Sequence, residues 1–214
     1  MTQRAVTLTR LSFVAAPLLL VVYGSIRLLA PASKEPGMAW TVGHFAFLGG
    51  VLFLAWVCEG LRRAAVASAG PARRRMVRTA WVVALAGVAA ASAQAVIDIY
   101  VGIRAADKPE MSDMFDRVQS VPGVLPVVYT VVPLFLYLGM IALLVTLKGP
   151  GIIRSLVLFV LGTVAIAVNL DFLPLGGLCY LLAFSPLRHR VAARQVTVPG
   201  RPVPIGAGTV GPRV

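Results

Sequence analysis

The sequence predicts an all-α protein, a polytopic transmembrane bundle of about six helices. Hydrophobic residues make up 58% of its 214 residues and charged residues only 13%. The apolar residues fall into blocks of membrane-spanning length, and most of the arginines lie in the short segments between the blocks. No internal repeat or second soluble domain is evident. We therefore expect a single transmembrane domain over residues 1–187, followed by a basic, Gly/Pro-rich and disordered tail over 188–214.

The apolar blocks define the expected spans in order. The first follows Arg4 and Arg10 like a signal peptide, but it continues without a small-residue cleavage site, which favours a retained helix. Pro133 should kink the fourth span and leave room for a cavity. The sixth span is short: its roughly 24 Å of helix is less than a hydrocarbon core of about 30 Å. The spans are 11–29, 40–61, 79–103, 124–147, 152–170 and 172–187.

The charges predict the orientation in the membrane. The net charge of +12 reflects arginines between spans, so it indicates topology and not a nucleic-acid partner. Segment 62–78 holds six arginines and no acid, whereas segment 104–121 holds four acids. The tail is also basic and free of acids. These patterns predict a multi-pass protein of the cell membrane with both termini cytoplasmic. Glu59, at the cytoplasmic end of its span, should pair with Arg62 and Arg63.

Three polar residues are expected to gather near the outer face of the membrane. Asp98 lies 20 residues beyond Arg78, or about 30 Å along the third helix. His44 lies just inside the second span, and Asp171 lies in the turn that ends the fifth. An ionised carboxylate in hydrocarbon costs at least about 2.5 kcal/mol, so such acids are usually partnered or functional. Each of the three could also be an ordinary interfacial or packing residue.

One face of the third helix supports an interior position for Asp98. Gly87, Ala91, Gln94 and Asp98 follow i, i+4, i+7, i+11 spacing and therefore share a small, polar face. Such a face packs closely against other helices, and Gln94 could hydrogen-bond Asp98. Packing alone would also explain this pattern.

The chemistry that remains open to these residues is acid catalysis on an apolar molecule. Motifs for nucleotide binding, serine hydrolysis and zinc proteolysis are absent from the sequence. The two cysteines form no CxxC pair, and the only histidines, His44 and His189, are expected on opposite sides of the membrane, which excludes bis-histidine haem. A carboxyl group in a low-dielectric pocket can stay protonated and protonate an alkene or epoxide. Aromatic rings at the same depth could stabilise the resulting cations: Trp40, Phe45, Phe47, Tyr100, Tyr129 and Phe172.

With its size, its arginine-rich and small-residue composition, and the acids Asp98 and Asp171 near one face, the chain resembles the bacterial membrane-bound terpene cyclases that act on prenylated aromatic compounds. More distantly, it resembles the sterol isomerases of the emopamil-binding-protein type. Asp171 departs from this pattern because it lies in a turn and not within a helix.

The resemblance implies a proton-initiated cyclisation of an isoprenoid chain, without cofactor or metal, on an apolar isoprenoid-type molecule from the lipid bilayer. Asp98, Asp171 and His44 would be the catalytic residues. The substrate would contact Trp40, Phe45, Phe47, Gln94, Tyr100, Tyr129 and Phe172. The alternative is a non-enzymatic membrane protein, such as a small transporter or permease component or an accessory lipid-binding subunit. The sequence leaves the oligomeric state open.

Overall fold

The computed structural model describes residues 3–67 and 69–196, and within this part of the chain it contains helices and no strand. The predicted all-α class is confirmed. The helices are α1 (Gln3–Leu29), η1 (Pro31–Lys34), α2 (Met38–Val66), α3 (Pro71–Arg104), α4 (Lys108–Gln119), η2 (Leu125–Thr130), α5 (Val131–Val145), α6 (Ile152–Val168), η3 (Leu170–Phe172) and α7 (Leu173–Val196).

Five helical segments of the described chain are long and apolar enough to cross a membrane, as expected of a multi-pass membrane protein: Thr7–Leu29, Met38–Val66, Pro71–Arg104, Leu125–Val145 and Leu170–Arg188. Ile152–Val168 is a shorter apolar helix of 17 residues. The sequence predicted that the last helix would be the short one, and this prediction was wrong. The short apolar helix is α6.

Helix α7 continues nine residues beyond Leu187, into the segment expected to be a disordered tail. The sequence-based boundary was placed where the apolar residues end, but Ala, Arg and Gln are good helix formers and prolong the helix past that point. Residues 197–214 of the expected tail lie outside the described residues.

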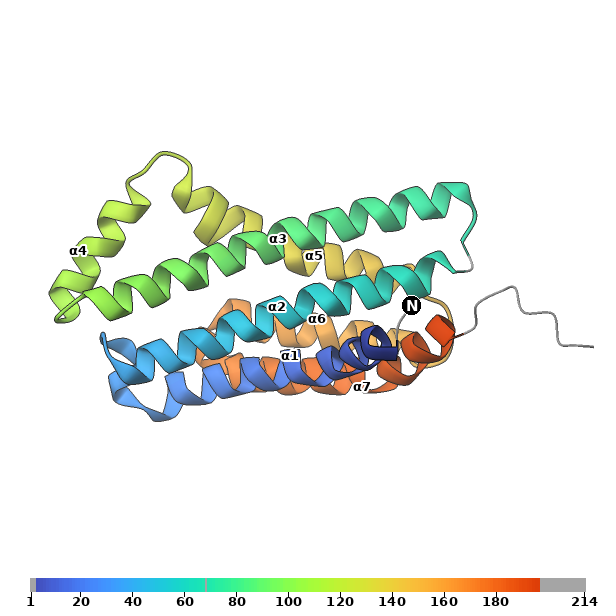
Figure 1. Cartoon of the computed structure of the whole chain (residues 1–214), viewed down its shortest axis with the longest axis horizontal. Coiled ribbons are helices and arrows are strands. Elements are labelled where there is room, and N and C mark those ends of the chain that lie inside the picture. Colours follow the sequence, from blue (N-terminus) through green and yellow to red (C-terminus); the bar gives the residue numbers. More distant parts are fainter. Residues whose placement is uncertain (1–2, 68, 197–214) are drawn as a thin grey trace, which may run out of the picture.

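The spans form an open ring in which α5, α3, α2, α1, α7 and α6 follow one another as packed neighbours. Contact between α5 and α6, which closes the ring, is limited. Helix α1 begins and helix α7 ends at the same end of the bundle as the α2–α3 turn (Figure 1). We call this the arginine end, after the arginines of segment 62–78, and the opposite end, where α4 lies, the α4 end.

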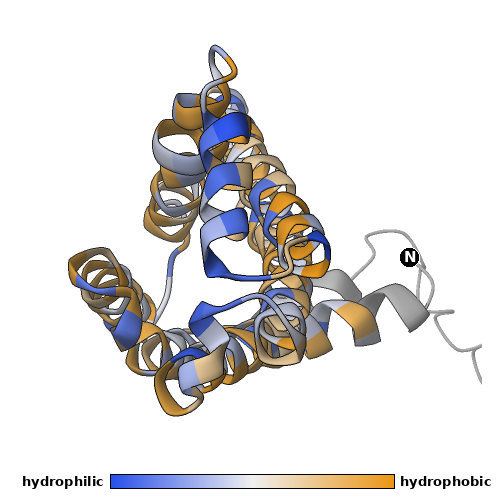
Figure 2. Ribbon diagram, turned by 90° about the vertical axis from the view of Figure 1, so that its left-hand side faces the viewer, coloured by the Kyte–Doolittle hydropathy of each residue, from blue (hydrophilic) through white to orange (hydrophobic). Residues whose placement is uncertain are grey.

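Helix α4 lies within the acidic segment 104–121, where no helix was among those expected from the sequence. Asp107 caps it by accepting a hydrogen bond from the Glu110 backbone N–H at 2.9 Å. Its ribbon is largely hydrophilic, whereas the spans behind it are largely hydrophobic (Figure 2). The apolar side of α4 packs on the end of α3, where Met111 and Phe115 contact a cluster that includes Val101 and Trp40. Helix α4 thus covers the end of the bundle where Asp98 lies.

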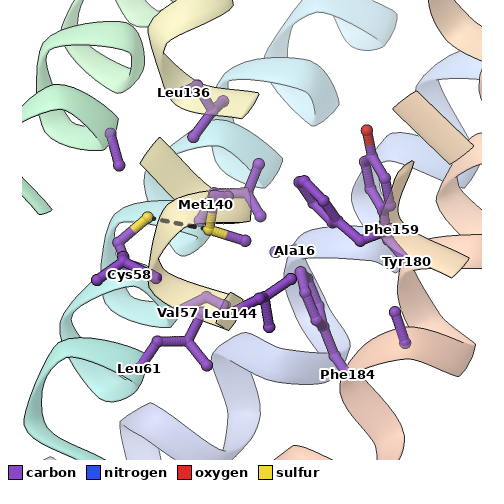
Figure 3. Packing of buried hydrophobic residues seen from close by; sticks show 14 of the residues in the cluster. Ala16, Val57, Cys58, Leu61, Leu136, Met140, Leu144, Phe159, Tyr180 and Phe184 are labelled. Carbon is purple, nitrogen blue, oxygen red and sulfur yellow. Dashed lines mark hydrogen bonds between the residues drawn. The ribbon is translucent and has the colours of Figure 1, made fainter. Parts of the chain in front are cut away.

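The core lies between the spans and is packed most tightly where glycines face a neighbouring backbone. A Cβ at Gly87 would come within 2.0 Å of the Leu136 backbone nitrogen, and one at Gly139 within 2.4 Å of that of Ala84. These glycines let α3 and α5 approach closely. Figure 3 shows the adjoining cluster, with Cys58 Sγ 3.2 Å from Met140 Sδ.

At the arginine end, Glu59 forms the predicted ion pairs with two arginines. Its carboxylate accepts two hydrogen bonds of 2.7 Å from Arg62 and a further one from Arg63. The Arg62 guanidinium also lies over the Trp81 ring, 5.2 Å from the centroid. These contacts pair the single acid of this helix end with neighbouring cations in the interfacial position that the sequence predicted.

Candidate functional site

A cavity of about 470 Å³ lies in the half of the bundle nearer α4. This volume is within the range of small-molecule sites. Helices α1, α2, α3, α5, α6 and α7 all contribute to its wall, which is mostly apolar with a few polar side chains. Exposed residues of α5 and α6, among them Leu134 and Val168, belong to the wall, so the cavity reaches the bundle surface at the α5–α6 seam. An apolar ligand could therefore enter from the lipid.

Asp98 is the acid of this cavity. It is 7% exposed, which is unusual for a carboxylate, and it lies on the α3 face that points into the bundle. The Tyr129 hydroxyl donates to its Oδ1 at 3.4 Å, and His44 Nε2 lies 3.6 Å from its Oδ2. The predicted proximity of Asp98 and His44 is confirmed. Gln94 lines the same cavity, but its expected hydrogen bond to Asp98 does not form in the described structure.

The backbone fixes the tautomer of His44. Its Nδ1 lies 2.8 Å from the Trp40 carbonyl oxygen, which can only accept a hydrogen bond, so Nδ1 carries a proton. In a neutral ring, Nε2 is then a lone pair that faces the Asp98 carboxyl. Two lone-pair groups at 3.6 Å attract each other only when a proton lies on one of them. With one proton between them, the pair could exist as acid and imidazole or as carboxylate and imidazolium.

Trp40 ties α2 to α3 beside this pair. Its indole N–H donates to the Asp98 backbone oxygen at 2.7 Å, and its ring stacks on His44 with centroids 4.1 Å apart. Gly102 makes the space, since a Cβ there would lie 2.1 Å from the indole Cδ1. Tyr23 of α1 packs edge-on against His44, with its hydroxyl 3.4 Å from Nε2. The imidazole is thus held from both sides.

The α-helical hydrogen bonding of the fourth span is interrupted in the turn that contains Tyr129, which lines the cavity. Residues Leu125–Thr130 form a π-helical turn, and the Val131 N–H bonds to the Pro126 oxygen, one residue further back than in an α-helix. Pro133 has no N–H for the helix ladder, and it lines the cavity. The predicted cavity beside Pro133 is confirmed, whereas the irregular turn lies before Pro133 and not at it. Short π segments of this kind are frequent at functional sites.

The structure separates the other predicted site residues from the cavity wall. Asp171 instead forms an ion pair with Arg27, at 3.3 Å, and neither residue lines the cavity. Phe45, Tyr100 and Phe172 are 55%, 57% and 46% exposed on the outside of the bundle. The reason for the first two is helical geometry.

Residues two apart on a helix point in nearly opposite directions. Phe47 lines the cavity, so Phe45 cannot, and Asp98 points inward, so Tyr100 points outward. Of the expected substrate-contacting residues, Phe47, Gln94 and Tyr129 line the cavity, and Trp40 supports the His44–Asp98 pair.

Sequence reasoning missed five polar residues of the wall: Tyr23, Thr130, Tyr137, Thr163 and Tyr180. Tyr137 and Tyr180 lie deeper in the bundle than the expected polar layer, and a tyrosine within an apolar span reads as an ordinary core residue. Only the packing of α1, α5, α6 and α7 brings them together.

Within the described residues, no group of three or more His, Cys, Asp or Glu side chains is arranged to hold a metal ion. Comparison with protein families, with curated proteins and with solved structures finds no match to this chain. Its function is therefore inferred from the site itself.

Proposed function

We propose that this protein is a membrane enzyme that cyclises the isoprenoid chain of an apolar substrate by protonating it. The observation that supports the proposal is the buried Asp98 carboxyl, which faces a mostly apolar cavity and is paired with His44 and Tyr129. A buried acid that holds a proton beside an apolar cavity is the equipment this reaction needs. Entry at the α5–α6 seam suits a substrate dissolved in the bilayer.

The reaction needs no co-reactant. Protonated Asp98 gives its proton to a carbon of the terminal alkene, or to an epoxide oxygen, and a carbocation forms. The next double bond attacks the cation and closes a ring. Loss of a proton from a neighbouring carbon restores a double bond, so the product is an isomer of the substrate. The deprotonated His44–Asp98 pair accepts that proton and so returns to its starting state. The proton of the pair exchanges with water between turnovers.

The aromatic wall has a role in this scheme. The rings of Tyr23, Phe47, Tyr129 and Tyr137 belong to the cavity wall. Ring faces attract cations by about 0.5–2 kcal/mol each, more where water is excluded. They would stabilise the cation between the protonation and deprotonation steps and keep water from trapping it as an alcohol.

The same proposal includes the orientation. Segment 62–78 and the chain termini would face the cytoplasm, and the α4 end, with the cavity in the neighbouring half of the bundle, would face outward. Asp98 would then lie near the outer boundary of the hydrocarbon core of the cell membrane.

Activity is tested with membranes that carry the protein, incubated with a farnesylated hydroxy-aromatic compound. Mass spectrometry and NMR should find an isomeric cyclic product. Membranes carrying Asp98→Asn should give none, since this change keeps the shape of the side chain but removes the acid. The matched control is Asp113→Asn on α4, which alters an exposed carboxylate outside the cavity. Product formation by Asp98→Asn at the wild-type rate would refute the proposed role.

A further inference from the structure

The inner end of the cavity contains a second polar group of residues, which the reaction scheme does not use. Thr163 of α6 and Tyr180 of α7 line this part of the wall, with their hydroxyl oxygens 2.9 Å apart. The Tyr180 ring is 1% exposed and stacks on Phe159, with centroids 4.7 Å apart. Figure 3 shows its hydroxyl pointing away from Phe184.

The direction of the hydrogen bonds in this group follows from counting protons. The Thr163 hydroxyl donates to the Phe159 backbone oxygen at 2.9 Å. A hydroxyl has a single proton, so Thr163 must accept in its contact with Tyr180, and Tyr180 must donate. The Tyr180 oxygen therefore offers the cavity a lone pair and no proton. A ligand group that carries a hydrogen can donate to it.

We propose that Tyr180 and Thr163 form a recognition site for a hydroxyl group, so that the ligand of this cavity is an apolar molecule bearing an alcohol or phenol at its inner end. An ammonium donor would be costly in this apolar, membrane-embedded wall, whereas a neutral hydroxyl is not. The Tyr137 phenol lines the same cavity and forms no hydrogen bond with a described residue. It can donate to the ligand oxygen.

The position of this site also orients the substrate, an inference that rests on the proposed cyclisation. Tyr180 lies seven residues along α7 from Leu173, and Ala91 lies seven residues along α3 from Asp98, all four in the cavity wall. Seven residues of helix span about 10 Å. A prenylated phenol would bind with its hydroxyl at Tyr180 and extend its chain toward Asp98, which places the alkene and not the aromatic ring at the acid.

Binding of two probes to the purified protein in detergent tests the recognition site without catalysis. Farnesol can donate a hydrogen bond, whereas farnesyl methyl ether can only accept one. Wild-type protein should bind tritiated farnesol between about twofold and about tenfold more tightly than the tritiated ether, the worth of one hydrogen bond. Tyr180→Phe, which keeps the ring stack, should abolish this preference. Tyr100→Phe, the matched control on the lipid-facing surface, should retain it.

Two further variants separate this inference from neighbouring explanations. Thr163→Val removes the acceptor of the Tyr180 hydroxyl, so the Tyr180 proton can point into the cavity. The ether should then bind more tightly, and the preference for farnesol should shrink. This variant decides the question if Tyr180→Phe does not fold. Asp98→Asn should keep the full preference for farnesol over the ether. The binding test therefore holds even if the cyclisation proposal fails. Equal binding of the two probes by the wild type, or a preference that survives Tyr180→Phe, would overturn the inference.

Discussion

Replacement of Gly102 by alanine tests how closely Trp40 is packed against α3. The new methyl group would lie 2.1 Å from the indole Cδ1 and 2.5 Å from Nε1, whereas carbon atoms in contact are about 3.5–4.0 Å apart. The indole must therefore move by more than about 1 Å. It would lose its 2.7 Å hydrogen bond to the Asp98 backbone oxygen and its stacking on His44.

The expected magnitude combines three effects. Overpacking costs about 1–3 kcal/mol, and the lost hydrogen bond about 0.5–1.5 kcal/mol. The higher helix propensity of alanine offsets about 1 kcal/mol. A net loss of about 2 kcal/mol should lower the midpoint of thermal unfolding by about 4–8 °C for a chain of this size.

The assay is thermal unfolding in detergent, followed by circular dichroism. Gly49→Ala is the matched control, because Gly49 lies inside α2 and a Cβ there would meet only the flexible Leu19 Cδ1, at 3.2 Å. It should unfold at or above the wild-type temperature. If Gly102→Ala also unfolds at or above that temperature, Trp40 does not occupy the position described, and the support for His44 is lost.

Three other substitutions have defined outcomes. Tyr129→Phe should lower the initial rate of cyclisation about fivefold to tenfold, because it removes a donor to Asp98 at a rather long 3.4 Å; an unchanged rate would exclude that contact from the reaction. Asp171→Asn should change the rate by less than about twofold, because Asp171 pairs with Arg27 away from the cavity wall, and a large loss of rate would return Asp171 to the site. Glu59→Gln should destabilise the protein by at most about 1 kcal/mol in thermal unfolding, because partly exposed ion pairs contribute no more than that. A much larger loss would show that the fold depends on these ion pairs.

The parts of the fold that depend on one-dimensional properties were predictable from sequence. The approximate position of each apolar helix follows from hydropathy, and depth follows from counting residues at 1.5 Å each, which placed Asp98 and His44 at one level. The structure brings the two within 3.6 Å of each other. Pro133 and the Glu59 ion pairs were likewise predictable, because local chemistry determines them.

What the sequence could not provide is the direction in which each side chain points and the order of the helices around the ring. Depth put Phe45 and Tyr100 at the level of Asp98, but both are exposed on the outside of the bundle. Thr163 and Tyr180 meet only because α6 packs along α7. A hydropathy profile contains no information about such neighbours.

The most direct test of the central claim is cyclisation in heavy water. A reaction begun by proton transfer from Asp98 to an alkene must place a solvent-derived hydrogen on carbon. Wild-type membranes in deuterium oxide should therefore convert a farnesylated hydroxy-aromatic compound into a cyclic isomer that carries one deuterium at the protonated carbon, by mass spectrometry and NMR, and Asp98→Asn membranes should give no such product. Recovery of unchanged substrate from wild-type membranes, or of a cyclic product without deuterium on carbon, would contradict the account.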